Sequence, residues 1–429
     1  MLERYALSPM RDLWTLAAQY GRWLEVELAC LSALEELGHI PQGTADSVRK
    51  KARIDVERIL AREREVGHDL IAFLLVLEEE VGPKGRWLHY GLTSSDVKDT
   101  ALALALREAL GLVLEKAKKL SQVLWELALR YRDAPMVGRT HGQYAEPITF
   151  GLKVLVWYDG LSRVRKRLLA AREAISVGKL SGAVGTYAHF PPEAERRALA
   201  KLGLAPCPIA TQVIPRDRHA EVLFALAAAA SWVETIALEV RHLSRSEVGE
   251  VAEGRPEGSS AMPHKKNPIL SERLCGLARL VRTTVVPALE NSVLWHERDM
   301  SHSSVERILL PQAFILVDYM LDRATDLIKN LKVYPERMLS RLMGARGLPF
   351  SEGLLLSLVE KGMSRKEAHT LVRRLAAEAE RNEVELKEVA ACNPEVLKLL
   401  APKELEAVFD LKKALSRVPE IFQRFSPPE

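Results

Sequence analysis

The sequence predicts an all-α protein with three helical domains, of which the central one is a bundle of very long helices. Apolar residues recur three or four positions apart along almost the whole chain, and runs of alternating apolar and polar residues are rare. The longest stripe extends from Leu102 to Leu127 and ends at Asp133-Ala134-Pro135. A helix of over thirty residues is about 50 Å long. A rod of that length needs other long helices beside it.

The spacing of the breaks predicts the domain organisation. Residues 1–93 carry short periodic runs and should form an N-terminal helical domain. Residues 94–342 should form the central long-helix bundle, with Ser95 as the N-cap of its first helix. Residues 343–429 shorten again and should form a C-terminal helical domain. Further long helices of the central bundle are expected at 147–176, 217–248, 268–290 and 305–331.

The charge balance argues against a nucleic-acid-binding surface. The 429 residues include 61 basic and 57 acidic side chains, for a net charge of +4, so any basic site is local and suits a small anion. The four cysteines lack metal-binding spacing and are expected to be reduced thiols of a cytoplasmic protein. The charged first residues predict no signal peptide. The apolar run at 222–233 is short, which favours a buried helix over a membrane span.

The clearest departure from helical sequence is EGSSAMPHKKNP at 257–268. Asn267 and Pro268 fit an N-cap and the first position of the next helix. That interpretation leaves the paired serines and the HKK triplet unexplained. A glycine-flanked loop that leads into a helix N-terminus, with two lysines beside it, suits the binding of an anion. We therefore predict a functional loop at 253–268.

Histidines stand in two further polar breaks. His141 lies in a turn within GRTHGQYAEP, which makes it a candidate acid or base. His68 and His89 lie in EVGHDL and WLHYGLTSSD, and the hydroxyl and backbone donors of Thr93 and Ser94 suit a carboxylate at the start of the long helix. The alternatives are that these two histidines are packing residues or share a metal ion, although no HxxH or HxxxH spacing supports a metal site.

A fourth polar segment is WHERDMSHSSVERILLP at 295–311. Ser303 followed by Glu306 fits a capping box, and the segment would then be only a helix start. Ser303 and Arg307 are also four residues apart and thus share a helix face. A hydroxyl and a guanidinium on one face suit a phosphate or a carboxylate.

These segments together resemble the fumarase/aspartase superfamily of lyases. GSSAMPHKKNP resembles its signature loop, and HYGLTSSDVKDTA and GRTHGQYAEP precede that loop in the superfamily's order, over nearly the whole chain. HERDMSHSSVER, ERYA and VGHD resemble the branch that acts on succinylated purine nucleotides. The resemblance implies a fumarase/aspartase-like all-α fold and a homotetramer with active sites shared between subunits.

The implied reaction is the elimination of fumarate from adenylosuccinate to give AMP, and from the succinylated ribotide SAICAR to give AICAR, in purine biosynthesis. The resemblance implies no cofactor, no metal, and no nucleic-acid or membrane partner. Ser259 would remove a weakly acidic proton beside a carboxylate, and the cation of Lys265 would stabilise the carbanion. His141 would protonate the leaving amine, with Glu272 orienting it. The implied catalytic residues are Ser259, His141, His68, Lys265 and Glu272.

The implied substrate-binding residues fall into three groups. The succinyl carboxylates and neighbouring polar groups would meet Thr93, Ser94, Thr140 and Gln212. The phosphate and ribose would meet Arg4, Tyr5, Arg298, Ser303 and Arg307. Further contacts would come from Gly67, His68, Asp69, His89, Lys265, Asn267 and Arg273.

Three other interpretations stay open. A 3-carboxymuconate-type cycloisomerase shares the signature loop but handles no nucleotide, so the cluster of Arg298, Ser303 and Arg307 argues against it. A non-catalytic structural protein on the same scaffold is disfavoured by the intact signature residues, such as Ser259 and His141. A helical scaffold without activity would leave the four polar breaks unexplained.

Overall fold

The computed structural model describes residues 3–254, 257–258, 262 and 264–428. Over these residues the protein is all-α with a few short strands, as the sequence predicts. The chain forms two compact units, called unit 1 and unit 2 below. Unit 1 comprises Met1–Ala117, Arg163–Glu234 and Leu274–Arg323, and unit 2 comprises Lys118–Ser162, Thr235–Arg273 and Ala324–Glu429. The three-domain boundaries stay a prediction.

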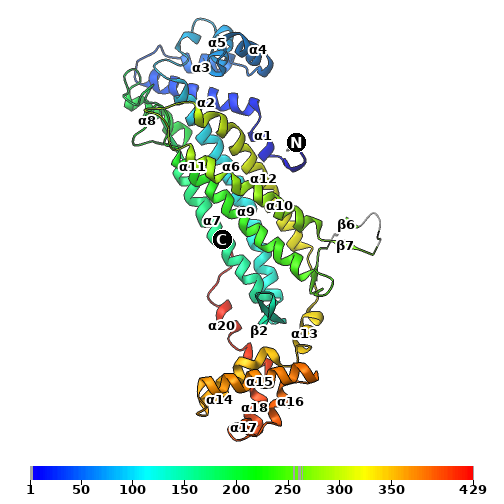
Figure 1. Cartoon of the computed structure of the whole chain (residues 1–429). Helices are drawn as coiled ribbons and strands as arrows, with labels where there is room; N and C mark the ends of the chain where they lie inside the picture. Colours follow the sequence, from blue (N-terminus) through cyan, green and yellow to red (C-terminus); the bar gives the residue numbers. More distant parts are fainter. Residues whose placement is uncertain (1–2, 255–256, 259–261, 263, 429) are drawn as a thin grey trace. The chain divides into compact units, whose positions relative to one another are not determined.

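Short helices begin unit 1 (Figure 1). They are η1 Glu3–Tyr5, α1 Met10–Leu13, α2 Leu16–Glu36, α3 Thr44–Lys51, α4 Val56–Val66, α5 Asp69–Val81 and η2 Gly85–Trp87. Their core contains Tyr20, Trp23 and Phe73, whose ring centroids lie 5.2 to 5.9 Å apart. Gly67 ends α4 in the left-handed conformation that glycine adopts without strain, at a φ of 70°. The chain therefore turns sharply there, and α5 begins two residues later.

The helices that follow include the long helices α6, α7, α9 and α12 (Figure 1). They are α6 Ser94–Arg130, α7 Phe150–Ile175, α8 Pro192–Leu202, α9 Asp217–Leu243, α10 Ile269–Thr283, α11 Val285–Glu290 and α12 Ser301–Lys329. Within unit 1, Lys116 of α6 is ion-paired with Asp318 of α12 at 2.8 Å, and Arg172 of α7 donates to a carbonyl of α6 at 3.2 Å. Arg163 of α7 lies over the Trp232 ring of α9. Helices α6, α7, α9 and α12 thus each contact another long helix within unit 1.

The predicted starts of α6 and α7 are wrong. Ser95 is not an N-cap, because α6 begins at Ser94 and the carboxylate of Asp96 accepts from the backbone N–H of Thr93 at 2.8 Å. The helix expected from residue 147 begins at 150, because an antiparallel hairpin of β1 (Pro135–Thr140) and β2 (Gln143–Thr149) precedes it. Gly138 permits this pairing, since a Cβ there would lie 2.7 Å from the Glu146 carbonyl oxygen.

Helix α9 contains the apolar run at 222–233. It has 27 residues and is long and apolar enough to cross a membrane, so the shortness of the run alone is no argument against a span. In its most apolar window, 56% is buried within the protein. Phe224 and Leu238 of the same helix are 54% and 43% exposed. Helix α9 thus presents apolar side chains both to the interior and to the outside.

Unit 2 holds the hairpin, two smaller strand pairs and the C-terminal helices. β5 (Val251–Ala252) pairs with β8 (Lys332–Val333), and β6 (Glu257–Gly258) pairs with β7 (Lys266–Asn267); in unit 1, β3 (Val177–Gly178) pairs with β4 (Ala205–Pro206). The C-terminal elements are α13 Pro335–Met343, η3 Leu348–Phe350, α14 Ser351–Glu360, α15 Arg365–Asn382, α16 Leu386–Ala391, α17 Pro394–Leu397, α18 Pro402–Val408, α19 Leu411–Ala414 and α20 Val418–Phe422.

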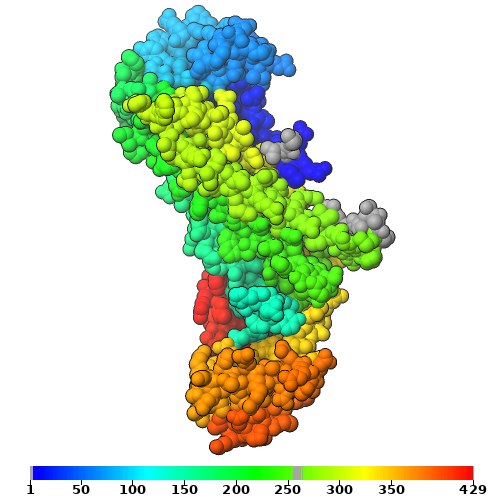
Figure 2. Space-filling model, in the orientation of Figure 1, coloured from blue at the N-terminus to red at the C-terminus, as the bar shows by residue number. Residues whose placement is uncertain are grey.

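The last residues of the chain return to α7. The hydroxyl of Tyr158 donates to the Ser426 carbonyl at 2.6 Å, and its ring lies edge-on to Phe425. Figure 2 shows these C-terminal residues, in red, against the long-helix part of unit 2. The C-terminal segment is therefore fixed by a hydrogen bond and a ring contact as well as by its own apolar core around Leu354 and Leu375.

Candidate active site

A cavity of about 480 Å³ lies in unit 1, within the size range of small-molecule sites. Four of the predicted binding residues line it: Asp69, Arg298, Ser303 and Arg307. Its walls come from the α1–α2 region, the start of α5, the first turns of α6, and the segment from Arg298 into α12. The fold therefore gathers residues from distant parts of the sequence around one concave, partly charged surface.

Asp69 is the acidic centre of this surface. It is ion-paired with Lys98 of α6, and its Oδ2 accepts from Arg307 Nη2 at 2.9 Å. Burial raises the pKa of this carboxyl, but the hydrogen bond and charge of Lys98 outweigh burial and leave the pKa below its ordinary value. Asp69 is thus ionised at neutral pH and holds the guanidinium of Arg307 at the cavity.

The start of α12 differs from the predicted capping box. Asp299 provides the cap instead: its Oδ1 accepts from the Ser301 N–H at 2.7 Å, and its Oδ2 accepts from the Trp295 N–H at 2.7 Å. Because the helix begins at 301, Ser303 and Glu306 lie inside it rather than at its end. Ser303 is thus free of a capping role, and Glu306 is buried against other charges.

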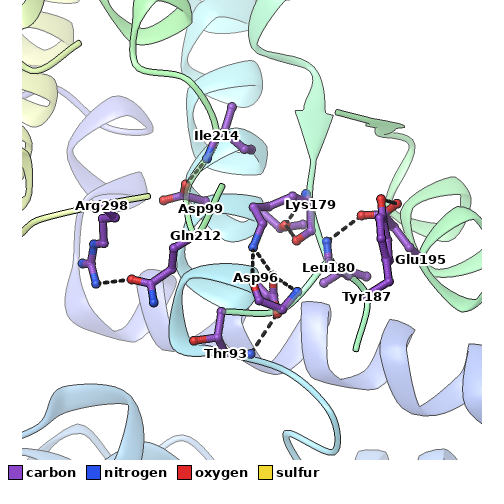
Figure 3. A network of polar contacts seen from close by, with 12 residues as sticks. Thr93, Asp96, Asp99, Lys179, Leu180, Tyr187, Glu195, Gln212, Ile214 and Arg298 are labelled. Carbon is purple, nitrogen blue, oxygen red and sulfur yellow. Dashed lines mark hydrogen bonds and ion pairs between the residues drawn. The ribbon is translucent and has the colours of Figure 1, made fainter. Parts of the chain in front are cut away.

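Gln212 and Arg298 contact each other (Figure 3). Arg298 Nη1 donates to Gln212 Oε1 at 2.8 Å, and the Gln212 N–H donates to the Glu297 carbonyl at 3.3 Å. Two residues that are 86 positions apart in sequence are therefore part of one hydrogen-bonded group. The resemblance implies different parts of the substrate for these two residues, and nothing in the sequence indicates this contact.

Part of the cavity lining is a buried ionic cluster that carries no signal in the sequence. Arg216 donates to both carboxylate oxygens of Asp99, at 2.7 and 2.8 Å, and its Nε lies 3.1 Å from Glu306 Oε1. Burial raises the pKa of Asp99, but the charge of Arg216 outweighs it and lowers the pKa to about 2. Burial raises the pKa of Glu306 to about 7 despite the same arginine. Burial, together with the charge of Arg216, lowers the pKa of His219 to about 3 and of His302 to about 4.

His68 is the N-cap of α5, directly after Gly67. Its Nδ1 accepts from the Ile71 N–H at 3.4 Å and also lies 3.4 Å from Asp69 Oδ1, so Nε2 is the ring nitrogen left for a ligand. The side chain is 44% exposed. His68 therefore combines a capping role with an imidazole edge that a ligand can reach.

His89 is held by a buried carboxylate that the sequence did not reveal. Its ring Nδ1 lies 2.9 Å from Glu27 Oε1, and its backbone N–H donates to Glu27 Oε2 at 2.8 Å. Glu27 is fully buried on α2. The loop bends back at Gly91, where a Cβ would lie 2.4 Å from the His189 carbonyl oxygen. Glu27 thus fixes the orientation of the His89 ring, and Nε2 is the ring nitrogen that this carboxylate does not contact.

Thr93 and Ser94 are supported by a second buried pair, which Figure 3 shows. Asp96 accepts from the Thr93 N–H and is ion-paired with the buried Lys179. The same carboxylate accepts from the Gly182 N–H at 3.2 Å. The first turn of α6 is therefore fixed, and Thr93 and Ser94 stay partly exposed at its start.

Arg4 and Tyr5 belong to η1 of unit 1. Arg4 is exposed, and the Tyr5 ring lies edge-on to Tyr319 of α12, with centroids 5.1 Å apart. That contact ties the N-terminal segment to the helix that carries Ser303 and Arg307.

In unit 2, Thr140 and His141 lie at the tip of the β1–β2 hairpin. Thr140 pairs with Gln143, so His141 and Gly142 form the turn, both with positive φ. The hairpin is anchored by Arg139, which makes two hydrogen bonds, of 3.0 and 2.7 Å, to the fully buried Glu250. His141 is exposed, so its imidazole is presented on a fixed turn.

The functional loop and its following helix also lie in unit 2. Lys265 is exposed, and Asn267 lies in β7 opposite Glu257 instead of capping α10, which begins at 269. The α10 N-terminus, which the sequence suggested for a ligand anion, already holds an anion: Glu253 accepts from the Ser271 N–H at 2.8 Å and the Ser271 hydroxyl at 2.6 Å. Glu272 is exposed and Arg273 half-buried in the first turn. Ser259 lies outside the described residues.

A metal site at the histidines has no support in the described part of the chain, where no three His, Cys, Asp or Glu side chains are placed to hold an ion. The two polar clusters found here, one in each unit, can bind anions through arginine and lysine, and the histidines can transfer protons.

Comparison with known proteins gives consistent matches. A family model described as lyase matches residues 6–283, and one described as adenylosuccinate lyase C-terminus matches residues 347–425. The chain is 52% identical over 428 residues to the curated adenylosuccinate lyase of Thermotoga maritima, covering 99% of each. The solved fumarate lyase from Mesorhizobium sp. BNC1 superposes with a TM-score of 0.90 at 29% identity, covering 98% of this chain and 97% of that one. The 3-carboxy-cis,cis-muconate lactonizing enzyme from Pseudomonas putida gives 0.87 at 28% identity, covering 98% and 96%.

Proposed function

The chain belongs to the adenylosuccinate lyase family of the fumarase/aspartase superfamily, and from this premise we propose how its residues divide the reaction between them. The protein is a carbon–nitrogen lyase that eliminates fumarate from adenylosuccinate and leaves AMP. The observation that carries this function is the 52% identity over 99% of the chain, far above the 28% shared with the muconate lactonizing enzyme. We propose SAICAR as a second substrate.

The first chemical step removes a proton beside a carboxylate. Ser259 is proposed as the base, and Lys265 as the cation that favours its alkoxide and stabilises the carbanion. The helix N-terminus contributes less than the sequence suggested, because the carboxylate of Glu253 already occupies N–H groups there. Lys265, which is exposed, and the amide of Asn267 remain as the stabilising groups.

The second step expels the purine amine. His141 is the proposed general acid, because an imidazole transfers protons near neutral pH and the hairpin tip leaves it open to a ligand. Glu272 is proposed to orient this imidazole. His68 is proposed to act beside it from the phosphate end, through the Nε2 edge that its capping role leaves free.

Binding of the nucleotide is proposed to centre on the cavity of unit 1. Arg298, Ser303 and Arg307 line it, and a charged fork and a hydroxyl on one helix face suit a phosphate. Further proposed contacts are Arg4, Tyr5, Gly67, Asp69 and His89 around the nucleotide, and Thr93, Ser94, Thr140, Gln212 and Arg273 around the succinyl part.

We further propose a homotetramer in the cytoplasm, with each active site completed by several subunits. The exposed apolar side chains of α9, such as Phe224 and Leu238, support an assembly that covers them. The same assembly would bury the apolar side chains of α9, so that their exposure would no longer favour a place in a membrane.

The test of function is direct. Purified protein is mixed with adenylosuccinate, without metal or added cofactor, and the release of fumarate and AMP is followed by absorbance and chromatography. SAICAR is tested in parallel, and a muconate lactone serves as the control substrate. Absence of fumarate from both succinyl substrates, with turnover of the lactone, would overturn the assignment.

A further inference from the structure

Glu306 occupies an unusual place beside the proposed phosphate-binding residues. It lies on α12 between Ser303 and Arg307 and lines the same cavity. Its side chain is almost fully buried, with 8% of the residue exposed. A phosphate bound in this cavity would carry about two negative charges at neutral pH, and an acidic group in this position would face it. Such a neighbour weakens binding if it is ionised.

The charges around Glu306 compensate a second carboxylate only in part. Arg216 makes two hydrogen bonds to Asp99, and its Nε also lies 3.1 Å from Glu306 Oε1, so one guanidinium is shared between two carboxylates. The charge of Arg216 lowers the pKa of Glu306, but burial raises it by more. An ionised Glu306 would therefore be a buried charge with poor compensation.

The remaining groups facing this carboxyl do not change that balance. The titratable and charged groups around it are Asp99 of α6, Arg216 before α9, His219 of α9, Arg298 before α12 and His302 of α12 itself. Both histidines are uncharged at neutral pH because burial lowers their pKa values, to about 3 and about 4. Arg298 donates through Nη1 to the neutral amide of Gln212 and keeps its positive charge, which lowers the pKa of Glu306 without outweighing burial. Burial raises the pKa of Glu306 itself to about 7.

We propose that Glu306 is a positioning residue that makes phosphate binding in this cavity dependent on its own protonation. When it is protonated, the carboxyl of Glu306 lines the cavity as an uncharged group, and its O–H is a further hydrogen-bond donor beside Ser303 and Arg307. Without the proton, it presents a negative charge to the phosphate. Nucleotide binding above neutral pH is therefore accompanied by uptake of one proton by Glu306. This inference rests on the proposed function, which brings a phosphate to these residues.

The experiment measures AMP binding by calorimetry from pH 6.5 to 8.5, in two buffers of different ionisation enthalpy. The wild-type dissociation constant should rise above pH 7 by up to tenfold per pH unit, the limit for one linked proton. Proton uptake per AMP should approach one at pH 8.5. Glu306→Gln, which is neutral at every pH, should lose both effects and bind AMP up to about thirtyfold more tightly than wild type at pH 8.5.

Two further variants keep the result interpretable. Glu306→Asp keeps a titrating carboxyl and should keep proton uptake, which a merely structural role would not predict. Glu290→Gln removes an exposed glutamate outside the cavity and should follow the wild-type curve. Parallel pH profiles for wild type and Glu306→Gln would refute the role of Glu306 alone. Failure of wild-type protein to bind AMP at any pH, or to release fumarate, would instead refute the proposed function.

Discussion

Arg298 Nη1 donates a 2.8 Å hydrogen bond to Gln212 Oε1, so two residues assigned to different ends of the substrate touch each other. The contact fixes the guanidinium at the rim of the cavity, with its second nitrogen left for a ligand. Gln212→Ala removes the acceptor. Because a hydrogen bond to a charged group contributes about 1.5–3 kcal/mol, we expect KM for adenylosuccinate to rise about 10- to 100-fold.

A double-mutant cycle separates this coupling from independent losses. If Gln212 acts through Arg298, then Gln212→Ala adds little to the loss caused by Arg298→Ala, and the coupling in kcat/KM exceeds about 1 kcal/mol. Gln122→Ala, on the exposed face of α6, is the matched control and should combine additively with Arg298→Ala. Additive effects of Gln212→Ala as well would show that the two residues bind the substrate separately.

Part of the acid sensitivity should come from His219, and His302, whose pKa burial lowers to about 4, should add to it. Burial, and after it the charge of Arg216, lowers the pKa of His219 to about 3, from an ordinary value of 6.5. Below pH 6.5 the unfolded chain binds a proton that the folded chain refuses, so the free energy of unfolding falls as pH drops towards 3. At about 1.4 kcal/mol per pH unit, wild type should lose about 2 kcal/mol by pH 5 from this group.

Urea unfolding at pH 7 and pH 5 measures this effect. His219→Gln is uncharged at both pH values and should lose about 2 kcal/mol less than wild type over the interval. His39→Gln changes an exposed histidine of the same unit and should behave as wild type does. An equal loss in His219→Gln and wild type would mean that other groups control the acid response.

Shared active sites predict complementation between inactive variants. Ser259→Ala should abolish the proposed base, and His141→Gln should lower kcat by about 100- to 10,000-fold while largely preserving substrate binding. Mixed tetramers of the two variants, formed by denaturation and refolding together, should regain part of the activity, because some sites then combine intact residues. Verified mixed tetramers without recovery would show that each site is built from one chain.

Much of the fold could be predicted because periodicity is a local property. The 3.6-residue period gives the long helices to within a few residues, and α12 begins at 301 where 305 was expected. The hairpin before α7 could not be predicted in the same way. Its turn needs two residues with positive φ, and His141 at a φ of 53° carries no sequence signal of the kind that Asn-Gly would give.

The site could be predicted only where its residues stand in polar breaks. Arg298, Ser303 and Arg307 interrupt apolar spacing and do line a cavity. Asp99 and Glu27 lie within helices. The sequence of a helix suggests that a charged residue faces solvent, and only tertiary packing buries these two. The capping role predicted for Glu306 is wrong for a related reason. A capping box requires the helix to begin at Ser303, whereas the contacts of Asp299 start the helix earlier.

Glu253 should control the position of Lys265, the proposed catalytic lysine. It precedes the functional loop, and its carboxylate, which is buried, holds the N–H and hydroxyl of Ser271 just after the loop. Glu253→Ala leaves these donors of the α10 N-terminus without an acceptor and should cost about 1–2 kcal/mol of unfolding free energy. Lys265 would then be held less firmly opposite the carbanion, so kcat should fall at least tenfold with a smaller change in KM.

Ser271→Ala is the matched control, since it removes only the hydroxyl and keeps the backbone N–H bond to the same carboxylate. It should lower kcat less than Glu253→Ala does. Stopped-flow measurement of fumarate release, with urea unfolding of the same samples, separates the two effects. A Glu253→Ala protein that is destabilised but keeps wild-type kcat would show that this carboxylate stabilises the helix without positioning the site.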